Sequence, residues 1–102
     1  MINPTIIISK LSLESFSLMK QIAENNPLSK VVFISDAVYM LTIQGIYSDE
    51  FKKLKNMGVI FYAISIDVLK RGIKDTIEGV VFIDYNNLVD LLLNESKSII
   101  NL

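Results

Sequence analysis

Four short runs rich in Ile, Val and Phe recur along the chain with almost no polar residues inside them. They cover residues 5–9, 31–35, 59–63 and 80–83. A strand that is buried on one face alternates apolar and polar side chains, whereas a continuous apolar strand suits a parallel sheet covered on both faces. The segments between the runs are long enough for helices, so the pattern predicts a βαβα order around a mostly parallel sheet.

Capping residues indicate where the intervening helices begin and end. Candidate N-caps are Ser12, Asp36, Ser48 or Asp49, Ser65, and Asp84 or Asn86. Candidate helix ends are residues 25–27, Gly45, residues 56–58 and Gly72. The tail at 96–102 is too short for a helix and is either an edge strand or a partner-facing arm. The expected architecture is a three-layer α/β/α domain with a four- to five-stranded sheet, flavodoxin-like or Rossmann-like.

Length and composition agree with a single compact unit. A chain of 102 residues is long enough for one core and too short for two, so residues 1–102 are expected to form one domain. Hydrophobic residues make up 51% of the chain and charged residues 21%. This balance leaves an apolar surface, part of which is expected to contact a partner.

The residue types that are missing restrict the possible chemistry. The chain contains no Cys and no His, which excludes thiolate chemistry, disulfides, imidazole catalysis and the usual zinc ligands on this polypeptide. The net charge of −1 favours neither nucleic acid nor anionic lipid as a direct partner. The longest apolar stretch, 59–64, is far below the ~18 residues of a membrane span, and the first ten residues do not form a secretory signal. We expect a cytoplasmic protein with no metal and no cofactor.

Polar side chains follow the apolar runs, where ligands gather in open α/β sheets. Asp36 and Asp84 each follow a run and could together perform acid/base chemistry or hold Mg²⁺. The simpler interpretation, which we favour, is that both cap helices. The sequence VVFISD also resembles the phosphoacceptor strand of a receiver domain, but Ser9 and Lys10 stand where such a domain needs further acidic residues.

Other candidate motifs have ordinary explanations. The four glycines form neither GxGxxG nor GxxxxGK[ST], so no nucleotide-binding motif is present. The tyrosines lack the basic stripe that would accompany base stacking. Lys52, Lys53 and Lys55 form a local basic patch that could contact a phosphate, although a solvated helix face explains it as well.

Three ordered blocks resemble the TusB/DsrH family, small cysteine-poor subunits of cytoplasmic sulfur-relay complexes. The blocks are VVFISDAVYML, IFYAISIDVLKRGI and VVFIDYNNLVDLLLNESKSI, and the similarity extends over residues 31–100. The chain departs from the family pattern at Ala37, where Gly is usual, at Ile66, where an acidic residue is common, and at Leu102, near which an aromatic residue is expected.

The resemblance implies an assembly of this chain with DsrE-like and DsrF-like sister subunits, with a homo-oligomer as the alternative. In the family, a Cys on the DsrE-like subunit carries the persulfide, and the relay serves 2-thiouridine formation at the tRNA wobble position or dissimilatory sulfur oxidation. The resemblance therefore implies a non-enzymatic structural or interaction subunit. The competing hypothesis is a small-ligand or Mg²⁺-dependent enzyme that uses Asp36 and Asp84.

The family pattern also suggests where a partner docks. Asp84 and Tyr85 match its Asp-Tyr pair, and the Asp36 block matches its Asp-Gly-Val-Tyr segment. The predicted partner-facing residues at the strand ends are Asp36, Tyr39, Ser65, Asp67, Asp84 and Tyr85.

Overall fold

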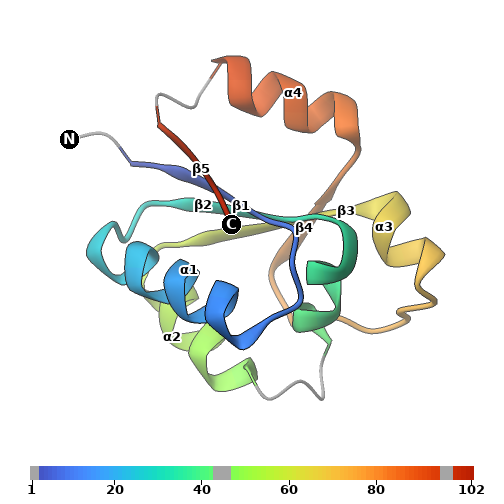
Figure 1. Ribbon diagram of the computed structural model, residues 1–102, viewed down its shortest axis with the longest axis horizontal. Helices are drawn as coiled ribbons and strands as arrows, with labels where there is room; N and C mark the ends of the chain where they lie inside the picture. Colours follow the sequence, from blue (N-terminus) through green and yellow to red (C-terminus); the bar gives the residue numbers. More distant parts are fainter. Residues whose placement is uncertain (1–2, 43–46, 95–97) are drawn as a thin grey trace.

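Five parallel strands run side by side through the centre of the molecule (Figure 1). The computed structural model describes residues 3–42, 47–94 and 98–102. Within these residues the sheet has the order β4-β3-β2-β1-β5, and every neighbouring pair is parallel. The strands are β1 (Thr5–Ile8), β2 (Lys30–Phe33), β3 (Ile60–Ile64), β4 (Val80–Ile83) and β5 (Ile99–Asn101). The predicted parallel sheet is confirmed, and the tail forms an edge strand.

Helices cover both faces of the sheet. They are α1 (Leu13–Asn25), the 3₁₀ helix η1 (Ser35–Leu41), α2 (Ser48–Met57), α3 (Ser65–Lys70) and α4 (Tyr85–Asn94). Figure 1 shows α1 and α2 on one side of the sheet and α4 on the other. The chain steps across the sheet in one direction from β1 to β4 and then returns to β5. Right-handed crossovers therefore place α4 on the opposite face, which gives the three expected layers.

The main core lies between the sheet and the helices α1 and α2. Phe33, Phe51 and Phe61 are buried there, with the Phe51 and Phe61 ring centroids 5.0 Å apart at 87°. On the α4 face a smaller cluster joins Val32, Ile64, Leu88 and Leu91. The second cluster is thin because, among the described helices, only α4 covers that face. Apolar side chains remain exposed on and beside the β4 edge, among them Val81, Phe82 and Val89.

Three of the predicted helix boundaries are confirmed by their hydrogen bonds. Ser12 caps α1 by accepting from the Ser15 N–H at 3.0 Å. Asp84 caps α4 by accepting from the Asn87 N–H at 2.6 Å. Gly72 ends α3 with φ of 65°, and the Ile73 N–H returns to the Val68 carbonyl, as in a Schellman motif.

Three predicted N-caps are wrong. Ile34, Tyr47 and Ile64 occupy the cap positions before η1, α2 and α3, and none makes a side-chain capping bond. At η1 and α3 the strand runs almost directly into the helix. Asp36 and Ser65 consequently lie inside the first turn instead of before it. Ser48 and Asp49 also lie inside the first turn of their helix, α2. Gly45 lies outside the described residues. None of the described helices has the length and apolar character of a membrane-spanning segment.

Candidate functional site

The ends of β2, β3 and β4 bring polar side chains together at one edge of the sheet. Asp36 follows β2 in η1, Asp67 follows β3 in α3, and Tyr85 follows β4 as the first residue of α4. The three strands are adjacent in the order β4-β3-β2, so residues far apart in the sequence meet beyond their carboxyl ends. Asp67, which follows the middle strand, lies at the centre of this group.

Asp67 is a buried carboxylate whose oxygens already have donors. Its Oδ2 accepts from the Ser35 N–H at 2.9 Å and from the Tyr85 hydroxyl at 2.7 Å. The Asp67 residue is only 7% exposed. Ser35 has a φ of 51°, a left-handed conformation that a non-glycine residue rarely adopts. The hydrogen bond that Asp67 accepts from Ser35 therefore fixes a strained turn at the end of β2, and with the bond from Tyr85 it joins the starts of η1, α3 and α4.

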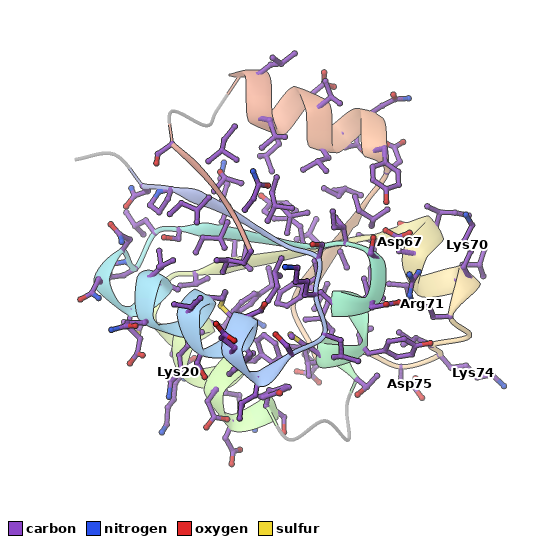
Figure 2. All side chains as sticks on the ribbon, in the orientation of Figure 1. Lys20, Asp67, Lys70, Arg71, Lys74 and Asp75 are labelled. Atoms are coloured by element: carbon purple, nitrogen blue, oxygen red, sulfur yellow. The ribbon has the colours of Figure 1, made fainter. Side chains whose placement is uncertain are left out.

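Arg71 connects the two aspartates of this edge. Its Nε and Nη2 lie 3.1 and 3.0 Å from Asp36 Oδ1, while its Nη1 donates to the Asp67 carbonyl at 3.1 Å and lies 3.7 Å from Asp67 Oδ1. Figure 2 shows Asp67 and Arg71 together at the end of the sheet, with Lys70 and Lys74 pointing away from it. Arg71 thus clamps the end of α3 to the start of η1.

The same contacts change the ionisation of Tyr85. The hydrogen bond to Asp67 is the main cause that raises the Tyr85 pKa above its usual 10.0, with burial and the nearby Asp67 charge acting in the same direction. Arg71 lowers it slightly. The hydroxyl is therefore held as a neutral donor, which suits a structural link between α4 and α3.

The carboxylates of Asp36 and Asp84 have separate partners. Asp36 pairs with Arg71, and Asp84 accepts from the Asn87 N–H while its own N–H donates to Asn87 Oδ1. Within residues 3–42, 47–94 and 98–102, no group of three acidic side chains gathers that could hold a metal ion. The geometry therefore gives the hypothesis of an Asp36 and Asp84 enzyme no specific support. Asp84 fulfils the capping role that we favoured, and Asp36 has an ion pair in its place.

The topological switch point of the sheet is a second place where ligands gather in such folds. Here it lies between β1 and β5. Leu102 is partly buried at this position, and its carbonyl accepts from the Ser9 N–H at 3.1 Å and from the Ser9 hydroxyl at 3.2 Å. The carboxyl ends of β1 and β5 are thus joined by the protein's own contacts.

The remaining predicted residues lie around the Asp67 network. Tyr39 is partly exposed on η1, and its carbonyl accepts from Thr42. Ser65 begins α3 and lines an apolar groove of about 560 Å³ between α3 and β4. The groove walls are Ile66, Val68, Leu69, Ile73, Phe82, Asp84 and Tyr85. Ile66, at the position where the family often has an acidic residue, contributes apolar surface to this groove.

Two members of the network were not predicted from the sequence. Arg71 is one of them, although its spacing of four residues from Asp67 allows an ion pair on one helix face. The part played by the Ser35 N–H depends on a backbone conformation that has no signal in the residue types. Ala37, which replaces the usual glycine, is fully buried and has no positive φ.

Comparisons with solved structures identify the fold. The chain is similar to a protein of unknown function, MTH1491, from Methanobacterium thermoautotrophicum, with 20% identity over 100% of both chains and a TM-score of 0.89. It is also similar to the ychN protein from E. coli, with 16% identity over 100% of both chains and a TM-score of 0.84. A conserved protein of unknown function, BT1422, from Bacteroides thetaiotaomicron, has 14% identity over 98% of this chain and 95% of its own, with a TM-score of 0.81.

Comparison at the sequence level is more specific. No curated protein sequence matches the chain. The model of the family described as DsrH like protein matches residues 9–98, which include all of α1 to α4 and three of the five strands, β2, β3 and β4. The match covers most of the chain and includes the blocks in which the resemblance was found. The chain therefore belongs to the DsrH-like family.

Proposed function

We propose that this chain is a non-catalytic structural or interaction subunit of a cytoplasmic sulfur-relay complex. The observation that carries the proposal is the family match over residues 9–98 in a chain that has neither Cys nor His. Persulfide transfer proceeds through a thiolate that attacks a sulfur atom. A chain without thiols contributes to such a relay by contact, and a Cys on a DsrE-like partner carries the sulfur.

The surface around the Asp67 network supports a docking role. Leu69 is 73% exposed and Phe82 is 49% exposed, and both line the groove between α3 and β4. Exposed apolar side chains around a concave surface are typical of protein contact sites. Beneath them, the Asp67 and Arg71 contacts hold η1, α3 and α4 in fixed positions, so the surface is rigid before a partner arrives.

The proposed partners are DsrE-like and DsrF-like sister subunits, with self-association as the alternative arrangement. The sulfur would be delivered to the wobble uridine of tRNA as a 2-thio group, or the complex would serve dissimilatory sulfur oxidation. In either pathway this chain contacts protein and neither nucleic acid nor membrane. The net charge of −1 agrees with a chain that does not bind nucleic acid or anionic lipid directly.

The test is co-purification with a Cys-bearing DsrE-like homologue from the same genome. Leu69→Glu and Phe82→Glu should each weaken the association roughly tenfold or more, because each places a charge in an apolar contact. Leu13→Glu is the matched control, since Leu13 is 66% exposed on α1, away from the groove. A chain that stays strictly monomeric beside the homologue would refute the proposal. Equal losses for Leu13→Glu and Leu69→Glu would place the contact elsewhere.

A further inference from the structure

A second pocket lies between α2 and the segment that leads into β4. Its volume is about 560 Å³, within the range of small-molecule sites. Phe61 near the start of β3 and Ile77 just before β4 belong to its lining, so it lies near the amino ends of these strands. The Asp67 network lies beyond their carboxyl ends. This pocket is therefore separate from the proposed docking groove.

The floor of the pocket is aromatic. Phe51 and Phe61 both line it, and their rings meet edge to face in the core with centroids 5.0 Å apart. Ile77 adds an aliphatic wall. Both Phe side chains are almost completely buried, so they form a rigid floor that leaves little aromatic surface open to a ligand. Ile77 is only partly buried and offers apolar surface to a ligand.

The rim of the pocket carries positive charge. Lys52 and Lys55 both line it from α2, and within the described part of the chain neither ammonium pairs with a carboxylate. The Lys55 Nζ lies 3.5 Å from the Glu78 carbonyl, across the turn at Gly79. Gly79 has a φ of 85°, and a Cβ there would overlap the Lys55 side chain. The glycine therefore leaves the space in which Lys55 lies along the rim.

Other polar groups in the lining limit the charge that we expect on the ligand. The lining also includes Asn56 and Glu78, so two cations face one carboxylate and the formal charge of the lining is +1. An anion would be attracted by the two ammonium groups and opposed by Glu78. Two lysines of the basic patch noted in the sequence, Lys52 and Lys55, thus flank a concave surface that includes apolar side chains.

We propose that this pocket binds a small organic anion, with the anionic group between Lys52 and Lys55 and an apolar body against Ile77. The site is independent of the sulfur-relay assignment, because it uses neither the Asp67 network nor the groove between α3 and β4. Occupancy by such an anion would join α2 to the turn before β4. The ligand class is therefore defined by one negative group attached to a small apolar body.

The probe for this proposal is 8-anilinonaphthalene-1-sulfonate, which combines a sulfonate with a flat apolar body. Binding to the full chain is measured by fluorescence titration, and the site is located from ¹H–¹⁵N chemical-shift changes. We expect shifts at residues 52–56 and 76–78. N-phenyl-1-naphthylamine, which lacks the sulfonate, and inorganic sulfate, which lacks the apolar body, should both bind more weakly than the probe.

Substitutions of charged residues in the rim should change the affinity for the probe in opposite directions. Lys52→Gln/Lys55→Gln should weaken probe binding roughly tenfold, the size expected for two partly solvated charge contacts. Glu78→Gln should tighten it. The control Lys53→Gln/Lys70→Gln removes the same net charge from α2 and α3 outside the pocket lining and should leave affinity nearly unchanged.

Several outcomes would overturn the proposal. One is equal weakening by the two double-lysine variants, which would mean that net charge alone attracts the probe. Another is a set of chemical-shift changes confined to the groove between α3 and β4, which would assign the probe to the docking surface. Equal affinity for the probe and its neutral analogue would show that the lysines contribute nothing. Circular dichroism spectra that match the wild type confirm that each variant remains folded.

Discussion

Replacing Asp67 by Ala tests whether this carboxylate holds the strand-end edge together. The substitution removes the acceptor for the Ser35 N–H and the Tyr85 hydroxyl and leaves the strained turn at Ser35 unsupported. It also leaves Arg71 with Asp36 as its remaining carboxylate partner in the described network. We expect a less stable protein whose main core is intact.

The magnitude follows from the individual contacts of Asp67. Each hydrogen bond to a charged acceptor contributes about 1.5–3 kcal/mol. Tyr85 is 46% exposed, so water partly replaces Asp67 as its partner and the lower end of that range applies to this bond. The two bonds together give a loss of about 3 kcal/mol in the free energy of unfolding, or about 12 °C in Tm for a domain of this size.

Urea unfolding followed by circular dichroism measures this loss, with Asp75→Ala as the control. Asp75 is exposed in the loop after α3 and should change stability by no more than about 0.5 kcal/mol when replaced. A double-mutant cycle with Tyr85→Phe should give a coupling energy of about 1 kcal/mol between Asp67 and Tyr85. If Asp67→Ala unfolds as Asp75→Ala does, the Asp67 network does not stabilise this edge and the argument fails.

Three further predictions address the other parts of the fold. The pKa of Tyr85 is raised in the folded state, so the Tyr85 hydroxyl contributes fully to stability below about pH 10, and this contribution is lost as the pH rises through the folded-state pKa. Urea titrations of Tyr85→Phe should show a smaller loss of stability at alkaline pH. Asp84→Ala should lower the free energy of unfolding by about 1 kcal/mol, because the cap of α4 is lost, and Mg²⁺ should not change the Tm of either protein. If Mg²⁺ raises the Tm of the wild type and Asp84→Ala abolishes that rise, the metal-dependent alternative is favoured. Phe33→Ala should cost about 3–5 kcal/mol in chemical denaturation, because Phe33 is fully buried among the core aromatic rings, and a loss below about 1 kcal/mol would contradict the packing described.

The sequence predicted the sheet because its signal is local and strong. The run at 80–83 coincides with β4, and the other three runs match their strands to within one or two residues. Ser12, Gly72 and Asp84 were recognised correctly because a cap or a left-handed glycine acts within three or four residues of its own position. The absence of Cys and His likewise restricts the chemistry whatever the fold.

The first residues of the helices that follow β2 and β3 were harder to predict. Ser65 and Asp36 are favourable capping residues, yet Ile64 and Ile34 hold the cap positions because strand and helix follow each other almost without a break. Where the strand hydrogen bonds end depends on the neighbouring strands and not on the residues at the junction. A propensity for capping therefore could not place these boundaries.

The amino-acid sequence by itself determined the parallel α/β architecture, the family and the lack of thiol or imidazole chemistry, because these depend on residue types and on short periodic patterns. Only the tertiary structure decided that Asp67 is the centre of the strand-end edge, that Arg71 joins it to Asp36, and that two lysines of α2 flank a pocket beside the segment that leads into β4. Those relations depend on which strands are adjacent and on the side of the sheet to which each connection returns. Both are set by the packing of the whole chain, so no local stretch of sequence contains them.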